Sequence, residues 1–490
     1  MGSLSLGNLS QYRYKWFMPS LITKLFGSTV LSLTLSLWGA ASASASTMDH
    51  PNIIWIMADD LGYGDLGSFG QKEIRTPHLD RLADEGMKLT DFYAGSTVCA
   101  PSRCVLMTGK HTGHAYIRGN REVKPMGQWP LPDATLTVAE LLKSAGYSTG
   151  LIGKWGLGGP GSEGAPNKQG FDYFFGYLCQ RHAHNFYPEY LFRNDQRVYL
   201  EGNIVENERL DGAGYATGRV HYSHDLFAND AINFVEENKS KPFFLYYSIT
   251  IPHANNEGGR KGMEIPSYGI YEEKDWPEPQ KGHAAMISLM DSDIGRLIET
   301  IKASGIAEKT LVIFTSDNGP HREGGNNPDF NNSNGPLKGI KRNLTEGGIR
   351  VPTIAWWPGK IKPGSSSNHI GYFGDLMATA AELSSQKTPE GLDSISFLPT
   401  LLSSGTQEAH DYLYWEFYSG SHRQAIRQGD WKAIRLNTGN VELYNLSNDL
   451  GEANNIAASH LGKVVRMVHL MDQAHNKSEF WTMKFAQKRK

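Results

Sequence analysis

The sequence is poor in cysteine, in net charge and in long apolar segments. Its 490 residues include three cysteines, Cys99, Cys104 and Cys179, and an odd number leaves at least one thiol of an exported protein unpaired or modified. A formal net charge of −3 gives no basic excess for binding nucleic acid. After the first fifty residues, no apolar run is long enough to span a bilayer. These absences describe an ordinary globular chain, long enough for a large domain and a smaller one.

Residues 1–46 are typical of a signal peptide. Three basic residues precede an apolar stretch from Leu25 to Trp38, and small residues from Ala40 to Ser46 offer a cleavage site. No cysteine follows the apolar stretch, which argues against a lipoprotein anchor. We therefore expect an exported protein, periplasmic or secreted, with no stable membrane span in the mature chain.

The pattern of apolar residues predicts an α/β fold. Strand-like runs alternate with amphipathic helical patterns from about residue 50 to residue 400, which favours a large, mostly parallel sheet flanked by helices. The expected strands are Ile53 to Met57, Tyr147 to Ile152, Phe243 to Ser248, Leu311 to Thr315 and Thr353 to Trp357, and the expected helices are Pro77 to Gly86, Leu136 to Ala145, Asp225 to Glu237 and His283 to Ala303.

Beyond about residue 405 the composition changes. Four short strand candidates, separated by turn signals, precede a helical pattern from Leu461 to Gln473. They predict a smaller subdomain built on an antiparallel sheet. The expected organisation is a signal peptide (1–46), a large domain (47–404) and a C-terminal subdomain (405–490).

Polar side chains follow four of the expected strands. In parallel sheets, ligands bind where the carboxyl ends of the strands converge. Three carboxylates and an amide among these residues form an all-oxygen set, which suits Ca²⁺ or Mg²⁺ and not zinc. Each pair alone is more often a loop cap or a turn, but together they favour a metal site. The residues are Asp59 and Asp60, Lys154, His253, and Asp317 and Asn318.

The segment Cys99-Ala-Pro-Ser-Arg103 places a thiol beside an expected helix. Pro101 can open a helix that runs to Thr108, so Cys99 would lie just before its positive end, where oxyanions bind. Arg103 adds a fork of donors suited to sulfate or phosphate. The alternative is a buried thiol at a helix cap. A disulfide between Cys104 and Cys179 is a further possibility that the sequence leaves open.

The glycine-rich segment from Gly150 to Lys154 lacks the spacing of a nucleotide-binding loop.

Several motifs together resemble the type I, formylglycine-dependent sulfatases of the alkaline phosphatase superfamily, in particular the bacterial arylsulfatase A-like carbohydrate sulfatases. They lie in the family's order from about residue 50 to residue 352, and Leu443-Tyr-Asn-Leu446 with Asp449 and Glu452 resembles the family's C-terminal subdomain, so the resemblance covers nearly the whole mature chain. The matching segments are Asp59-Asp60, Cys99-x-Pro-Ser-Arg103 with Leu106-x-Thr-Gly109, Tyr147 to Trp155, Asp317-Asn-Gly319, and Lys341 with Glu346-Gly-Gly-x-Arg350. The resemblance implies an alkaline phosphatase-like fold.

The resemblance also implies a mechanism. A formylglycine-generating enzyme would convert Cys99 to formylglycine, whose hydrate attacks the sulfur of a sulfate ester. Ca²⁺, or Mg²⁺, would be bound by Asp59, Asp60, Cys99, Asp317 and Asn318. The catalytic residues would be Cys99, Arg103, Lys154, His253 and Lys341. The two lysines would neutralise sulfate oxygens, and His253 would protonate the departing alcohol.

The chain departs from the family at Gly156, where the family commonly has a histidine two residues after the motif lysine. Candidates to fill the gap are His111, His114, His182 and His184, while Arg181, His321, Arg322 and Asn326 lie in loops that could recognise sugar groups. We expect a sulfatase that acts on a sulfated saccharide. The alternatives are a phosphate or phosphonate ester hydrolase of the same superfamily, and a glycan-binding protein derived from a sulfatase.

Overall fold

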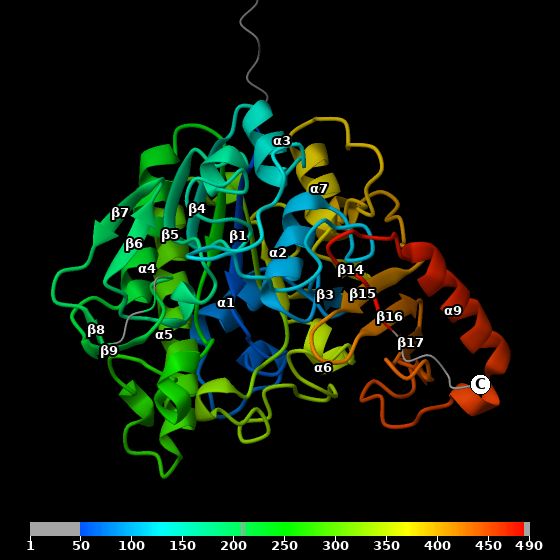
Figure 1. Cartoon of the computed structure of the whole chain (residues 1–490). Helices are drawn as coiled ribbons and strands as arrows, with labels where there is room; N and C mark the ends of the chain where they lie inside the picture. Colours follow the sequence, from blue (N-terminus) through cyan, green and yellow to red (C-terminus); the bar gives the residue numbers. More distant parts are fainter. Residues whose placement is uncertain (1–49, 207–208, 210, 485–490) are drawn as a thin grey trace, which may run out of the picture. The chain divides into compact units, whose positions relative to one another are not determined.

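A ten-stranded sheet is the largest element of the computed structural model, which describes residues 50–206, 209 and 211–484 (Figure 1). The strand order is β13-β2-β12-β11-β1-β10-β4-β5-β6-β7, and the five strands from β11 to β5 are parallel to one another. The predicted signal peptide, residues 1–46, lies outside the described residues. The strands are β1 (Asn52–Ala58), β2 (Met87–Leu89), β4 (Ser148–Lys154), β5 (Tyr173–Tyr177), β6 (Tyr190–Arg193), β7 (Gln196–Tyr199), β10 (Phe243–Ser248), β11 (Thr310–Ser316), β12 (Thr353–Trp356) and β13 (Ser365–Ser367).

Helices cover both faces of this sheet. Every residue of β1 is buried, since its alternating side chains enter two different cores. Ile53, Trp55 and Met57 share a core with α2 (Cys99–Thr108), α3 (Val138–Ser144) and α7 (Asp375–Leu383). Ile54 and Ile56 share the other core with α1 (Pro77–Glu85), α4 (Ser223–Asn238) and α5 (Glu278–Ala303). The predicted fold class is therefore confirmed.

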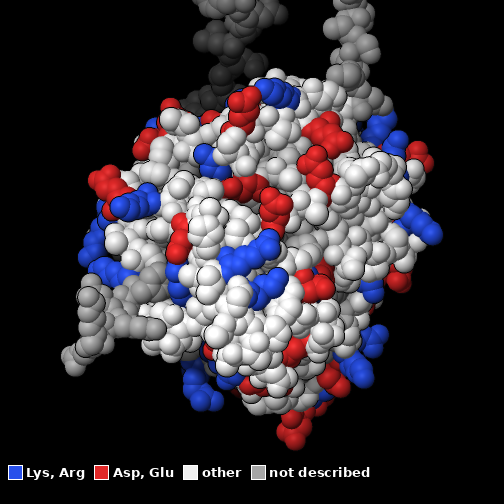
Figure 2. All heavy atoms as spheres, turned by 90° about the vertical axis from the view of Figure 1, so that its right-hand side faces the viewer, with Lys and Arg blue, Asp and Glu red and all other residues white. Residues whose placement is uncertain are grey.

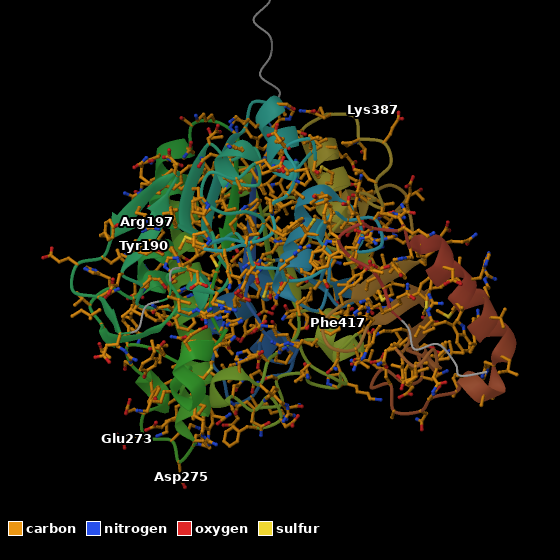
Figure 3. All side chains as sticks on the ribbon, viewed as in Figure 1. Tyr190, Arg197, Glu273, Asp275, Lys387 and Phe417 are labelled. Atoms are coloured by element: carbon orange, nitrogen blue, oxygen red, sulfur yellow. The ribbon has the colours of Figure 1, made fainter. Side chains whose placement is uncertain are left out.

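Some elements escaped the prediction. Helix α5 begins at Glu278 and not at His283, because Pro279 lies in its first turn, where a missing N–H is tolerated. Strands β2, β5, β6, β7 and β13 are only three to five residues long, too short to give a clear alternation. The β6–β7 hairpin is held in part by Arg197, whose guanidinium carbon lies 4.3 Å from the centre of the Tyr190 ring (Figure 3).

A second, antiparallel sheet follows near the C-terminus, as predicted. It consists of β15 (Leu413–Phe417), β16 (Arg423–Gln428), β17 (Trp431–Arg435) and β18 (Val441–Asn445). Helix α9 (Leu461–Ala474) packs on it through Met467 and Met471.

On the face of the molecule shown in Figure 2, Lys and Arg are interspersed with Asp and Glu. The boundary at residue 404 stays a prediction.

The remaining elements are short. Strand β3 (Phe92–Tyr93) pairs with β14 (Gly371–Tyr372), and β8 (Ile204–Glu206) pairs with β9 (Tyr215–Gly218). The short helices are α6 (Glu346–Ile349) and α8 (Leu398–Leu402). Within the described part of the chain, no helix combines the length and the apolar character needed to cross a membrane.

Candidate active site

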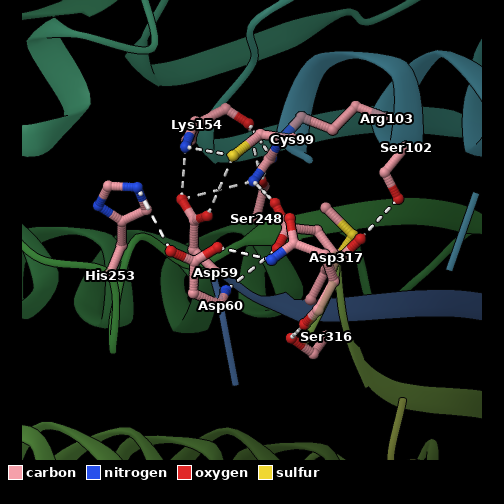
Figure 4. A network of polar contacts seen from close by, with 12 residues as sticks. Asp59, Asp60, Cys99, Ser102, Arg103, Lys154, Ser248, His253, Ser316 and Asp317 are labelled. Atoms are coloured by element: carbon pink, nitrogen blue, oxygen red, sulfur yellow. Dashed lines mark hydrogen bonds and ion pairs between the residues drawn. The ribbon is translucent and has the colours of Figure 1, made fainter. Parts of the chain in front are cut away.

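Four neighbouring strands bring the predicted site residues to one edge of the large sheet (Figure 4). Asp59 and Asp60 follow β1, and Lys154 is the last residue of β4. His253 follows β10, and Asp317 follows β11. Because β11, β1, β10 and β4 are adjacent and parallel, their carboxyl ends meet at this edge. The convergence expected from the sequence is present, and the chemical roles of these residues stay predictions.

Cys99 lies inside a helix and not before it. Helix α2 begins at Cys99, because Val98 has extended backbone angles, and Pro101 occupies the first turn, where its missing N–H breaks no helical bond. The expectation that Pro101 opens the helix is therefore wrong by two residues. Cys99 still lies in the first turn, at the positive end of the helix dipole. All three cysteines are free and buried, so no disulfide joins Cys104 and Cys179.

Cys99 has a cation and a carboxylate as its polar neighbours. Lys154 Nζ lies 3.4 Å from Cys99 Sγ, and Asp59 Oδ1 lies 3.6 Å from it. Lys154 Nζ also donates to Asp59 Oδ2 at 2.6 Å. Burial raises the pKa of the Cys99 thiol to about 12, and Lys154 opposes this only in part. An unmodified Cys99 would thus carry a protonated thiol, which is a weak nucleophile.

Arg103 is fully buried and binds the protein on several sides. Its Nη1 donates to the Lys154 carbonyl at 2.8 Å and to Ser248 Oγ, and its Nη2 donates to Asp317 Oδ2 at 3.1 Å. Burial acts against the charge, but Tyr246, Asp317 and nearby acids hold the pKa of Arg103 above its usual value. The guanidinium fork therefore fixes the ends of three strands beneath Cys99.

The carboxylates form a connected cluster. Asp317 Oδ1 accepts from the Asp60 backbone N–H at 3.0 Å, and Asp60 Oδ1 accepts from Asn318 Nδ2 at 2.6 Å. Lys341 Nζ donates to Asp60 Oδ2 at 2.7 Å. Asp60 has a φ of 69°, a left-handed conformation that is uncommon for a residue other than glycine. Strain of this kind is typical of functional sites.

These residues fit a hard cation. Asp59, Asp60, Asp317 and Asn318 are each at most 1% exposed, and Asn318 Oδ1 is buried without a hydrogen-bond partner among the described residues. Burial and the neighbouring Asp59 raise the pKa of Asp317 to about 7, so the carboxylates repel each other despite the nearby lysines. An all-oxygen donor set with excess negative charge suits Ca²⁺ or Mg²⁺.

His253 is held in one tautomer. Its Nδ1 donates to the Ala254 carbonyl at 2.6 Å, so its Nε2 accepts from Lys341 Nζ at 3.0 Å. Burial and the positive charge of Lys341 lower the pKa of His253 well below its usual value. The ring stacks on His184, with the ring centres 4.8 Å apart. His253 is therefore neutral and has its basic nitrogen next to a cation.

Of the four histidines considered for the gap at Gly156, the structure brings one to the site. His184 lines the same cavity as Cys99 and His253. His182 is fully buried between the rings of Tyr177 and Tyr190. His111 and His114 contact Asp393, and His111 lines a different cavity.

The side chain of Gln180 occupies the space beside Gly156. A Cβ atom at Gly156 would lie 2.7 Å from Gln180 Nε2. Gln180 also lines the cavity at Cys99, which has a volume of about 270 Å³. No pattern in the sequence indicated Gln180, because its contact with Gly156 depends on the pairing of β4 with β5.

The loop residues expected to recognise sugars divide into two groups. Arg181 lines the cavity and pairs with Glu122 at 2.6 Å. His321 is buried and donates from Nε2 to the Pro252 carbonyl at 2.9 Å, and Asn326 donates to the His321 carbonyl at 3.0 Å. Arg322 pairs with the exposed Asp329. Of these four residues, Arg181 is thus the one that lines the cavity, as His184 also does.

Comparisons with known proteins agree with this geometry. A family model described as Sulfatase matches residues 51–403, and one described as N-sulphoglucosamine sulphohydrolase, C-terminal, matches residues 340–477. N-acetylgalactosamine-6-sulfatase of Mus musculus is 32% identical over 415 residues, which cover 82% of this chain and 75% of the relative. Arylsulfatase A of Homo sapiens is 31% identical over 484 residues, covering 89% of each chain.

Two solved structures have the same fold. Ps i-CgsB in complex with k-i-k-neocarrahexaose is 27% identical with a TM-score of 0.72, covering 90% of this chain and 95% of that one. A sulfatase from a study of glycosaminoglycan metabolism by Bacteroides thetaiotaomicron is 28% identical with a TM-score of 0.70, covering 87% of this chain and 99% of that one. The chain belongs to the sulfatase family, the hydrolases of sulfuric esters.

Proposed function

We propose that this sulfatase removes sulfate from a sulfated saccharide. The observation that carries the proposal is the position of Cys99 on the wall of a cavity. The same cavity is lined by His253, by the polar side chain of Asn120 and by the cations Lys341 and Arg181. The cavity of about 270 Å³ is near the lower end of the usual range for ligand pockets, which suits one sugar unit. The relatives named above include a galactosamine sulfatase and a protein solved with an oligosaccharide.

The nucleophile we propose is formylglycine at Cys99, produced by a formylglycine-generating enzyme. Its hydrate supplies the hydroxyl that attacks sulfur and later allows the sulfate to leave. Cys99 and Arg103 match the residues of the family signature, and Arg103 holds Lys154 and Asp317 in place through hydrogen bonds of 2.8 and 3.1 Å.

The metal we propose is Ca²⁺, with Mg²⁺ as the second candidate. Asp59, Asp60, Asp317 and Asn318 would bind it, together with the modified residue at position 99. When bound, the ion would neutralise the carboxylates and polarise a sulfate oxygen. The free Oδ1 of Asn318 supports this assignment, because a buried acceptor without a partner is costly.

The charged residues of the cavity would stabilise the transition state. Lys154 lies next to Cys99, and Lys341 lines the same cavity as Cys99. Both cations would bind the sulfate oxygens as negative charge develops. His253 would protonate the departing alcohol from Nε2, after the negative charge of the bound sulfate group has raised the pKa of the ring and the ring has taken up a proton. Burial acts against the charge of Lys341, but Asp60 and nearby acids hold the pKa of Lys341 above its usual value, so Lys341 would stay a cation and would not supply this proton.

Export and domain organisation belong to the same proposal. The segment 1–46 supports an exported, periplasmic or secreted enzyme, with a catalytic domain over 47–404 and a C-terminal subdomain over 405–490. Exported location fits a substrate class of large sulfated glycans, which do not cross membranes.

The test compares matched sulfate and phosphate esters of one sugar. The full chain is produced together with a formylglycine-generating enzyme, and the mass of the peptide that holds Cys99 is measured. We expect an aldehyde at position 99 and faster hydrolysis of the sulfate ester. Faster hydrolysis of the phosphate ester would favour a phosphate or phosphonate ester hydrolase, and saccharide binding without turnover would favour a glycan-binding protein.

A further inference from the structure

Gln180 carries a polar group that the mechanism above does not use. Its side chain is only 5% exposed, and Nε2 is buried without a hydrogen-bond partner among the described residues. Gln180 lines the cavity that Cys99, His253 and Lys341 also line. Buried amide groups in folded proteins nearly always have a partner, so an unpaired donor beside a cavity is available to a group that binds there.

The position of Gln180 depends on a missing side chain. A Cβ atom at Gly156 would lie 2.7 Å from Gln180 Nε2 and 3.0 Å from Gln180 Cγ, too close for both to keep their places. Gly156 has a φ of 85°, and its N–H donates to the Leu178 carbonyl at 3.2 Å, so its backbone is fixed. The glycine therefore makes room for the amide of Gln180.

The amide of Gln180 packs beside Gly156, and Gly156 is close along the chain to a residue of the reacting centre. Gly156 follows Lys154 by two residues, and Lys154 Nζ lies 3.4 Å from Cys99 Sγ. The neighbouring carboxylate, Glu122, is engaged by Arg181 at 2.6 Å and does not pair with the amide. Nε2 donates and does not accept, while the oxygens of a sulfate group accept and do not donate.

We infer that Gln180 is a substrate-binding residue, whose Nε2 donates a hydrogen bond to an oxygen of the sulfate group held at Cys99. The inference rests on the proposed function and assigns a further residue to that site. A carboxamide neither gains nor loses a proton near neutral pH, so Gln180 binds and orients the sulfate group without acting as an acid or a base. Lys154 and Lys341 supply charge, and Gln180 supplies a donor of fixed direction.

The first test replaces the donor and keeps the volume. Gln180→Met in the full chain, matured by a formylglycine-generating enzyme, should lower kcat/KM for a sulfate ester about 10- to 100-fold. The inhibition constant of inorganic sulfate should rise in the same direction, while the pH profile and the melting temperature stay close to those of the wild type. Gln180→Glu, which has the same size but a negative charge, should lower kcat/KM further and raise the inhibition constant of sulfate further than Gln180→Met does.

Gln169→Met is the matched control. Gln169 is also fully buried, but its Nε2 donates to the Glu163 carbonyl at 3.0 Å and it does not line the cavity. Its loss should lower the melting temperature and leave kcat/KM and sulfate inhibition unchanged.

A second test uses the contact with Gly156. Gly156→Ala strains the backbone at φ 85° in any background, but the clash with the amide exists only when Gln180 is present, so Gly156→Ala should lower kcat/KM more in the wild type than in Gln180→Ala. Wild-type activity and sulfate inhibition in Gln180→Met and Gln180→Glu would overturn the inference, as would additive losses in the double variant. A wild type that binds sulfate but hydrolyses no sulfate ester would overturn the proposed function and not the inference. In that case, weaker sulfate binding by Gln180→Met than by the wild type would support the role of Gln180, and equal binding would overturn it.

Discussion

Two clusters of buried charge differ in what their polar atoms contact. The site cluster around Asp60 and Lys341 borders a cavity and contains an acceptor, Asn318 Oδ1, that has no hydrogen-bond partner in the described part of the chain. The second cluster, called here the joint cluster, links α6 of the large domain to the C-terminal sheet. Its members are Asp91, Glu346, Arg350, Arg427, Lys432 and Glu452.

A lysine in each cluster makes the comparison direct. Lys432 Nζ lies 2.7 Å from Glu346 Oε1 and 3.0 Å from Glu452 Oε1, so two carboxylates enclose it. Lys341 Nζ lies 2.7 Å from Asp60 Oδ2 and 3.0 Å from the neutral His253, and it faces the cavity. Charges that are paired among themselves hold two segments of the chain together. Charges that are left open to a cavity are available to a ligand.

The largest effect should come from the centre of the site cluster. Cys99→Ala removes the proposed nucleophile and should reduce sulfate ester hydrolysis by more than about 10⁴-fold. Because Cys99 forms no disulfide and the change removes only the end of a small side chain, the melting temperature should change little. Activity is measured on matured protein and unfolding by circular dichroism. A large fall in the melting temperature would instead support the view of Cys99 as a structural thiol.

Breaking the joint cluster should lower the stability of the protein and leave the activity of the folded molecules nearly unchanged. Lys432→Met leaves Glu346 and Glu452 buried without their shared cation, which should cost about 3 to 5 kcal/mol of unfolding free energy. The kcat of the molecules that remain folded should stay within about twofold of the wild type, since Lys432 does not line the cavity.

The control for this change is an exposed ion pair. Lys387 and Glu390 lie 2.7 Å apart with side chains 82% and 85% exposed (Figure 3). Lys387→Met should cost less than about 1 kcal/mol. Equal losses in unfolding free energy for the two variants would show that the joint cluster contributes no more than a surface pair.

Removal of the metal should also distinguish the two clusters, with a smaller effect on stability than Lys432→Met. Chelation should leave Asp59, Asp60 and Asp317 to repel each other, so the melting temperature should fall by several degrees and recover on addition of CaCl₂. The chelator should act on Lys432→Met to the same extent, because no ion is proposed at the joint cluster. A melting temperature that is insensitive to chelator, in protein shown by elemental analysis to contain no bound Ca²⁺ or Mg²⁺, would contradict the metal site.

The residues that could be predicted from the sequence are those whose position depends on one strand. Asp59 and Asp317 each follow an apolar run, and the end of that run already places them at the carboxyl edge of a parallel sheet. Gln180 could not be predicted, because its place beside Gly156 depends on the pairing of β5 with β4, and β5 is too short to recognise.

The joint cluster was beyond prediction for a related reason. Glu346 and Lys432 are 86 residues apart, and their contact requires the C-terminal sheet to dock on the large domain. The motif Glu346-Gly-Gly-x-Arg350 resembled a family signature, but the sequence could not show that both charged residues of the motif serve this contact. Local patterns thus predicted the positions of the proposed catalytic residues better than the contacts that support the fold.

The smallest effect should be a pH dependence confined to the joint cluster. Burial acts to raise the pKa of Glu346, but Lys432, Arg350 and Arg427 outweigh it and lower the pKa from 4.5 to about 2. A carboxyl group with a lowered pKa in the folded state stabilises the protein above its unfolded pKa, and this contribution is lost as pH falls toward the folded value. The difference in unfolding free energy between wild type and Glu346→Gln should therefore be largest near pH 7 and shrink between about pH 4.5 and pH 2. Denaturant titrations at several pH values measure it, and a difference that stays constant over this range would show that Glu346 gains no charge stabilisation from its three cationic neighbours.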